Sequence, residues 1–206
     1  VEVATTHPLR TAAGWKPASE LRIGDRIAAA RTAGRFGRGK LTARVLLTAY
    51  MIGDGCMKRP GSCSFTGNPG PTCTEFIALA SRLEAQGVHV VTRIGTSALD
   101  IRIHTDNKLC QWLAEDGLVG KGSADKFVPA WVFDLNRKAT AAFVSRLWAT
   151  DGCITTTENG SPTITYTSVS WQLARDVQAL LLKFGIVTCV VKRKAGYRSP
   201  KTGNYV

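Results

Sequence analysis

Two aspartates, Asp54 and Asp151, each stand between a run of mainly apolar residues and a glycine. Of the residues in this chain, these two are the strongest candidates for a functional site. The runs predict two helices, with each carboxylate just past the last helical turn. The carbonyl end of a helix is already negative, so a carboxylate there is unfavourable, and two such carboxylates side by side repel one another. A divalent cation held by both would relieve this repulsion, and Mg²⁺ prefers carboxylate and carbonyl oxygens.

A metal ion between two carboxylates can activate a water molecule and stabilise the oxygen that leaves a phosphodiester. The alternative is that both Asp-Gly pairs are ordinary turns, because a single pair of this kind is weak evidence for a site. Their matching places in an internal repeat favour the metal site.

The elements expected around the two aspartates follow one another in the same order in both halves of the chain. The first half predicts helix 41–52, segment 62–67, helix 74–86, strands 89–94 and 98–104, and a helix from Asp106 to about 115. The second half predicts helix 136–149, strand 164–168, helix 171–184 and strand 186–191. Asp54 corresponds to Asp151, Phe65 to Tyr166 and Gly87 to Gly185 at a nearly constant separation. This indicates a duplicated αββαββα unit whose second copy is incomplete.

Residues 1–40 have a different character. Residues 1–30 read as short strands and turns, with a β-rich start at 1–5 and a helical turn at 18–21. Residues 31–40 carry three glycines and four basic residues and predict a linker, so we expect a boundary near Lys40. The opening residues do not resemble a signal peptide, and we expect the chain to be an internal portion of a longer polypeptide.

The charge of the chain is strongly positive. It has 206 residues with 27 Lys and Arg against 15 Asp and Glu, a net charge of +12. The excess lies in 1–40 and 136–206, while 41–135 is neutral. Such a distribution suits a polyanion such as nucleic acid, although a solvated basic surface is the alternative. The apolar runs are too short to cross a bilayer, so no membrane span is expected.

Six cysteines follow no common zinc spacing. We expect free, mostly buried thiols in a reducing cytoplasm. A metal site made by Cys56, Cys63 and Cys73 is the alternative.

Three segments of the sequence resemble motifs of known families. LTAYMIGDG at 47–55 and VSRLWATDG at 144–152 resemble the paired motifs of LAGLIDADG (DOD-type) homing endonucleases. ATTHPLRTAAGWKPASELRIGDRIA, within residues 1–30, resembles the histidine-bearing block of an intein splicing (Hint) domain. A splicing block followed by an endonuclease is the order of an intein with an inserted endonuclease. The residues of the motifs are similar to those of inteins that interrupt bacterial replicative DNA helicases.

The resemblance implies an α+β fold with two pseudo-symmetric αββαββα repeats, after a β-rich splicing fragment. It places a partial splicing module and linker at 1–40 and the endonuclease at 41–206, with repeats 41–135 and 136–206. It implies a monomer with an internal pseudo-twofold axis, which cuts both strands of double-stranded DNA with Mg²⁺. The partners implied are that DNA and the host protein's exteins, from a replicative DNA helicase.

The resemblance also assigns residues. Asp54 and Asp151 match the metal-binding acids, one for each DNA strand, with carbonyls of Gly53 and Thr150 nearby. KFVP at 126–129 resembles the loop between repeats whose lysine is catalytic, so Lys126 is a candidate; the alternative is an ordinary surface charge. Candidates for contact with phosphates or guanine edges are Arg93, Arg102, Lys192, Arg193, Lys194, Arg198 and Lys201.

Two departures from the motifs stand out. Arg146 replaces a small residue where two helices should cross closely, and a buried, unpaired arginine there would be costly. We expect either a register shifted to Ser145 and Ala149 or an arginine at the rim. His7 would polarise a peptide bond in an intact intein, but the chain has neither a terminal nucleophile nor a terminal His-Asn pair, so we expect no splicing by this fragment.

Two rival interpretations remain beside the endonuclease. One is a DNA-binding remnant that has lost cleavage, which Arg146 and the missing last elements favour. The other treats the segment only as part of a splicing protein, with the remaining splicing residues outside it.

Overall fold

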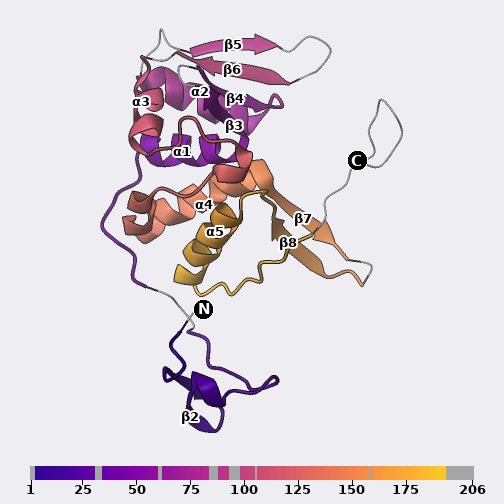
Figure 1. The fold of residues 1–206 in the computed structure, drawn as a ribbon. Coiled ribbons are helices and arrows are strands. Elements are labelled where there is room, and N and C mark those ends of the chain that lie inside the picture. Colours follow the sequence, from indigo (N-terminus) through magenta and orange to yellow (C-terminus); the bar gives the residue numbers. More distant parts are fainter. Residues whose placement is uncertain are drawn as a thin grey trace.

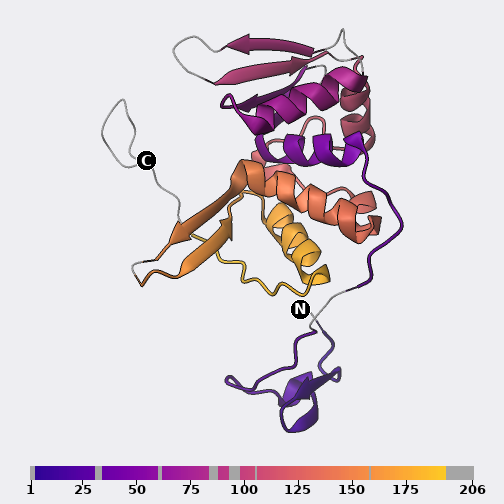
Figure 2. The same ribbon diagram turned by 180° about the vertical axis from the view of Figure 1, so that it is seen from behind.

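Two long helices form the centre of the molecule. The computed structural model describes residues 3–30, 34–59, 62–83, 88–92, 98–104, 106–157 and 159–193. Helix α1 (Ala43–Asp54) packs against α4 (Arg137–Asp151), and the two views show them side by side between the two halves of the chain (Figures 1 and 2). Helices and antiparallel sheets are both present, which confirms the predicted α+β class.

The first half forms one antiparallel sheet covered by helices. Its strands are β3 (Gly55–Arg59), β4 (Ser62–Gly67), β5 (Val88–Thr92) and β6 (Leu99–Ile103), in the order β3-β4-β6-β5. Helices α2 (Pro71–Leu83) and α3 (Lys108–Glu115) pack with α1. The core contains the rings of Tyr50, Phe65 and Phe76, with Phe65 stacked on Phe76 at 4.4 Å between ring centroids. Helix α1 is buried over eight successive residues, as its apolar sequence predicts.

The second half repeats this order from α4 through β7 (Gly152–Thr156), β8 (Pro162–Tyr166) and α5 (Trp171–Lys183). The strand registers match: Gly55 pairs with Phe65 in the first half, and Gly152 pairs with Tyr166 in the second. Phe65 and Tyr166 therefore occupy equivalent places, as the sequence comparison predicts. Gly185 has a positive φ of 81° after α5, which suits a glycine that ends a helix, whereas Gly87 lies outside the described residues.

Three expectations about elements are wrong. Residues 186–191 form no strand; their counterpart β5 pairs only with β6, and the residues equivalent to β6 lie outside the described part of the chain. Helix α3 is capped by Asn107 rather than Asp106, because the Asn107 side chain accepts from the Leu109 N–H. Both aspartates are the last residues of their helices rather than the residues after them.

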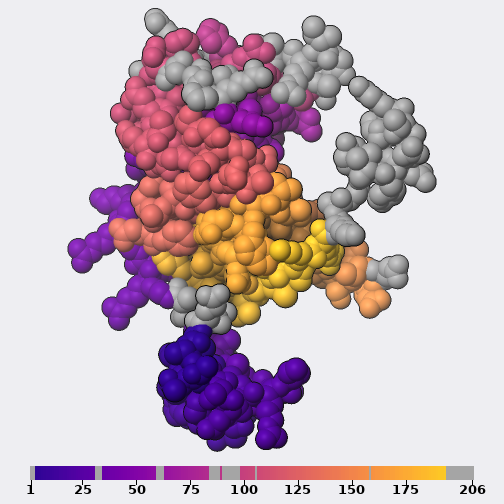
Figure 3. Space-filling view, viewed as in Figure 1, coloured from indigo at the N-terminus to yellow at the C-terminus, as the bar shows by residue number. Residues whose placement is uncertain are grey.

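Residues 3–30 form a small lobe at the bottom of the space-filling view (Figure 3). Strands β1 (Pro8–Thr11) and β2 (Gly14–Pro17) make a hairpin, and the helical turn η1 (Ala18–Glu20) follows as predicted. The β-rich start falls before the first strand: residues 1–2 are outside the described part, and 3–5 are not in a strand. The described linker residues run to α1 past a bridge between Gly39 and Leu135.

The two sheets differ in how well they are covered. Met57 and Cys63 lie on the buried face of β3 and β4, and the buried Cys110 of α3 belongs to the same core. The equivalent Ile154 and Ile164 pair across β7 and β8 and are 71% and 65% exposed. No helix equivalent to α3 covers them among the described residues, and the hairpin projects away from α5 (Figure 1).

This difference in burial predicts that the same kind of substitution destabilises the first half strongly and the second half hardly at all. Met57→Thr should lower the free energy of unfolding by about 2–4 kcal/mol, since it removes packed volume and buries a hydroxyl. Its matched partner Ile154→Thr should change that energy by less than about 0.5 kcal/mol, because the side chain is already in water. Urea titration of both variants measures this, and equal losses would show that the face of β7 and β8 is covered in solution.

Candidate functional site

The C-terminal ends of α1 and α4 meet at very close range. A Cβ atom placed on Gly53 would lie 2.0 Å from Oγ1 and 2.6 Å from Cβ of Thr150, so only glycine fits there. Gly53 and Thr150 directly precede Asp54 and Asp151. The crossing therefore brings together two carboxylates that are 97 positions apart in the sequence.

The two carboxylates influence one another electrostatically. Partial burial raises the pKa of Asp54 above its ordinary value, the Asp151 charge raises it further, and Lys126 lowers it. Partial burial also raises the pKa of Asp151, against the opposing effects of Lys126 and of a hydrogen bond from Tyr166. Raised carboxyl pKa values mean that the fold disfavours these two negative charges, and a bound cation would relieve that cost.

Lys126 lies beside both carboxylates and is almost fully buried. Its Nζ donates to the carbonyl oxygens of Gly53 at 2.6 Å and Gly55 at 2.9 Å, the residues that flank Asp54. Burial lowers the pKa of the Lys126 ammonium, while the neighbouring Asp151 and Asp54 charges raise it. The alternative of a surface charge is therefore wrong.

The loop that carries Lys126 is fastened to the second half of the chain. The Ser170 hydroxyl donates to the Lys126 carbonyl at 2.6 Å and also caps α5, and the Val128 N–H donates to Asp176 of α5 at 2.9 Å. The loop thus reaches from α5 to the end of α1, and Lys126 joins the two halves at the carboxylates.

Sequence reasoning used Tyr166 only as a landmark and missed its place in the site. Its hydroxyl donates to Oδ2 of Asp151 at 3.4 Å, and burial together with the Asp151 charge raises its pKa. Its pairing with Gly152, directly after Asp151, puts it there. The signal available in the sequence was the alignment of Tyr166 with Phe65, which shows that one copy has a hydroxyl and the other does not.

The donor atoms present suit a hard divalent cation. The carboxylates of Asp54, which is exposed, and Asp151, which is partly buried, repel one another, and Lys126 is the cation that lowers the pKa of both. Of the predicted backbone ligands, the Gly53 carbonyl already accepts from Lys126, which leaves it one lone pair. The other predicted backbone ligand, the Thr150 carbonyl, stays a prediction; the Thr150 hydroxyl donates to the Leu147 carbonyl of its own helix at 2.8 Å. The described residues contain no group of three or more His, Cys, Asp or Glu that could hold a metal ion, at Cys56, Cys63 and Cys73 or elsewhere.

Arg146 is neither unpaired nor at the tightest point of the crossing. It donates to both Glu75 oxygens, at 2.6 and 3.0 Å, and Glu75 also accepts from the Tyr50 hydroxyl. The Arg146 side chain is 26% exposed, so it lies at the rim, as one of the two predicted alternatives required. Three helices, α1, α2 and α4, are thereby joined at a point away from Gly53 and Thr150.

This pair makes stability depend on pH. The hydrogen bonds from Arg146 lower the pKa of Glu75 below its ordinary value of 4.5, so the pair contributes fully above that pH and is lost as the pH falls through the lowered value. Glu75→Gln should cost about 1 kcal/mol of unfolding free energy at neutral pH, a figure already reduced for partial exposure. The cost should shrink as the pH is lowered below 4.5 in urea titrations. A cost that stays constant across this range would contradict the assigned pair.

The predicted DNA contacts are only partly described. Arg102 lies on the open face of β6, with Nε 3.3 Å from Oδ2 of Asp100. Lys192 has its Nζ 5.1 Å from the centroid of the Trp171 ring, and Arg193 is exposed beside it. Arg93, Lys194, Arg198 and Lys201 lie outside the described residues.

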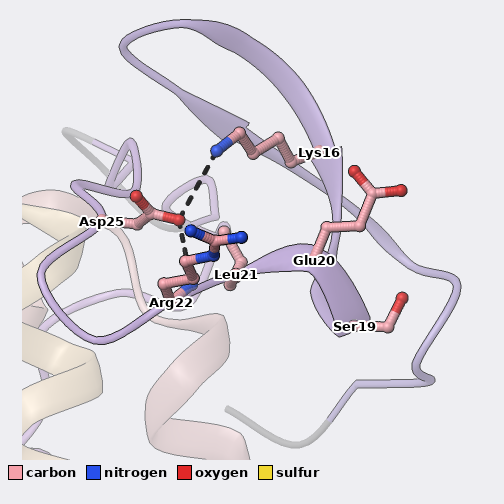
Figure 4. Close-up of a pocket in the computed structure, with 6 residues that line it drawn as sticks. All are labelled: Lys16, Ser19, Glu20, Leu21, Arg22 and Asp25. Carbon is pink, nitrogen blue, oxygen red and sulfur yellow. Dashed lines mark hydrogen bonds and ion pairs between the residues drawn. The ribbon is translucent and has the colours of Figure 1, made fainter.

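His7 is exposed in the N-terminal lobe, where its carbonyl accepts from the Ala18 N–H at 2.9 Å. The same lobe holds a shallow pocket lined by Lys16, Ser19, Glu20, Leu21, Arg22 and Asp25 (Figure 4). Asp25 accepts there from the Arg22 N–H at 3.0 Å and lies 3.6 Å from the Lys16 Nζ. Two of the four charged side chains that line the pocket, Lys16 and Asp25, therefore form an ion pair.

The cysteines and helices bear on two further expectations. All six thiols are free, but Cys56, Cys153 and Cys189 are exposed, so the expectation of mostly buried thiols is wrong. Among the described residues, no helix is both long enough and apolar enough to span a membrane.

Comparison with known proteins gives one domain match and several relatives, among them two DNA helicases and a RecA protein. Residues 138–206 match the LAGLIDADG-like domain. The chain is 32% identical over 197 residues to the replicative DNA helicase DnaB of Rhodothermus marinus, which covers 90% of this chain and 21% of that protein. It is 30% identical over 199 residues to DnaB of Synechocystis, with coverage of 90% and 23%. It is 29% identical over 197 residues to the protein RecA of Mycobacterium bovis, with coverage of 89% and 24%. The chain thus spans about a fifth to a quarter of the length of the relatives it matches.

Proposed function

We propose that the protein is the endonuclease-bearing part of an intein and cuts both strands of double-stranded DNA, because residues 138–206 match the LAGLIDADG-like domain. The observation that carries this proposal is the meeting of Asp54 and Asp151 beside Lys126 at the crossing of α1 and α4. It pairs one acid from each repeat, as a cut of two antiparallel strands requires.

The relatives support the insertion context. A helicase and RecA are different proteins, yet nearly the whole of this chain matches about a fifth to a quarter of each. A segment shared by hosts with different names is typical of an inserted element. On this proposal residues 1–40 are part of a splicing module, residues 41–206 are the endonuclease, and the exteins belong to a replicative DNA helicase.

Each group of the site has a distinct task in the proposed reaction. Asp54 and Asp151 would hold the cation, and Mg²⁺ bound there would supply an activated water and a Lewis acid for the leaving oxygen. Lys126 fixes the end of α1 through two carbonyls, and it places a positive charge where the phosphate becomes more negative. The oxygen of water forms a bond to phosphorus and its proton passes to solvent, while the bond to the leaving oxygen breaks and that oxygen takes up a proton from solvent.

We propose that the DNA lies on the open faces of the two sheets. Met57 and Cys63 mark the buried face of the first sheet, so Cys56, Lys58 and Arg102 point to the other. In the second sheet Cys153 and Thr165 occupy the same side as Cys56. Lys58, which sequence analysis did not select, thereby joins Arg102 as a basic group on this surface.

Cleavage of a defined duplex tests the proposal. The chain is incubated with a labelled duplex that carries the uninterrupted host-gene junction, in Mg²⁺ or in EDTA. We expect cutting of both strands in Mg²⁺ only. A matched duplex with the insertion in place should stay intact, because the recognition sequence is divided. Tight, salt-sensitive binding without any nick would instead select the cleavage-inactive DNA-binding remnant. The exposed face of β7 and β8 is the feature that favours this second candidate.

A further inference from the structure

The two carboxylates differ in their surroundings, although the repeats place them alike. The strand registers make Phe65 and Tyr166 equivalent, since each pairs with the glycine that follows its aspartate. Phe65 is fully buried and has no hydroxyl. Tyr166 has its hydroxyl 3.4 Å from Oδ2 of Asp151. The second repeat therefore has a donor to its carboxylate that the first repeat lacks.

The position of Tyr166 is set by its neighbours on α4 and β7. Its ring lies 5.2 Å from that of Trp148, three residues before Asp151, and its backbone is paired with Gly152. A ring held on two sides keeps its hydroxyl in place, so the hydrogen bond restricts rotation of the Asp151 carboxylate. At Asp54 the support is different: Lys126 holds the flanking carbonyls rather than the carboxylate itself.

From this asymmetry we infer that Tyr166 is a positioning residue for Asp151, and that the two DNA strands are consequently cut with different dependence on protein side chains. The inference rests on the proposed endonuclease function. The Tyr166 hydroxyl orients the Asp151 carboxylate, whereas the orientation of the Asp54 carboxylate does not depend on this hydroxyl.

Tyr166→Phe gives the sharpest test, because it removes one oxygen and installs the residue that the first repeat already uses. With each strand of the duplex labelled separately, Asp151→Asn first identifies the strand served by Asp151. Tyr166→Phe should then slow cleavage of that strand about fivefold and leave the cleavage rate of the other strand unchanged within experimental error. Equal slowing of both strands would show a merely structural role and overturn the inference.

A matched control and a second readout keep the inference separate from the function. Tyr50→Phe also removes a bonded hydroxyl, but its partner is Glu75, so it should not alter the ratio of the two strand rates. In metal-free protein, carbon NMR of the carboxyl groups should show the Asp151 resonance moved by Tyr166→Phe and the Asp54 resonance unmoved. An unmoved Asp151 resonance overturns the inference even if no strand is cut, whereas failure of the unmodified chain to cut DNA refutes the proposed function alone.

Discussion

Asp54→Asn and Asp151→Asn are each expected to slow cutting of one DNA strand by about a hundredfold or more and, in metal-free protein, to raise the melting temperature slightly. Each substitution keeps the shape of the side chain and removes one of two repelling charges. The pKa of both carboxyls is raised in the fold, so their charged forms oppose folding once the pH exceeds the ordinary value of 3.8. Removing one charge at neutral pH should therefore add about 0.5 kcal/mol after solvent screening, or about 1–2 °C.

The measurements are strand-resolved cleavage in Mg²⁺ and thermal unfolding in EDTA. Asp106→Asn is the control, because that side chain is 89% exposed and belongs to neither site nor core, and it should change neither quantity. If both site variants cut as fast as the unmodified chain, the roles given to Asp54 and Asp151 are wrong. If both lower the melting temperature, the two carboxylates are stabilised by partners other than a bound cation.

Gly53→Ala is expected to lower the free energy of unfolding by about 2–3 kcal/mol and to abolish cleavage. The added Cβ would lie 2.0 Å from Oγ1 and 2.6 Å from Cβ of Thr150, so α1 and α4 must move apart. That movement separates Asp54 from Asp151, since each follows one of the two clashing residues. Chemical unfolding and the strand-resolved cleavage assay measure the two effects.

A second-site change distinguishes this clash from a general intolerance of alanine. Combining Gly53→Ala with Thr150→Gly returns the space to the crossing and should recover most of the lost stability, less about 1 kcal/mol for glycine in a helix. Gly122→Ala is the matched control, because its Cβ would meet only Asp125 Oδ2 at 3.6 Å. A double variant as unstable as Gly53→Ala alone would mean that Gly53 is required for another reason.

The local features of this protein follow from its sequence. The apolar run before Asp54 and the glycine after it locate α1, because helix formation and termination depend on neighbouring residues. The repeated order of elements places Asp151 at the matching end of α4 and pairs Phe65 with Tyr166, as the two registers confirm. These results require only periodicity, glycines and a constant separation between landmarks.

Contacts between distant residues depended on the tertiary structure. Lys126 reaches carbonyls 73 and 71 positions away, and the Arg146 guanidinium finds Glu75 at a separation of 71. Nothing in the local sequence indicates that these two cations are paired, because the partners meet only when α1 and α4 cross. The predicted strand at 186–191 is wrong, and its apolar sequence could not decide this, because a strand also depends on a neighbour to pair with. The sequence by itself determined which two acids end the helices. Only the packing of those helices decided that the acids share a site. It also decided that the charge of a buried lysine acts on both acids and that one acid accepts from a tyrosine hydroxyl, since each depends on atoms brought together by folding.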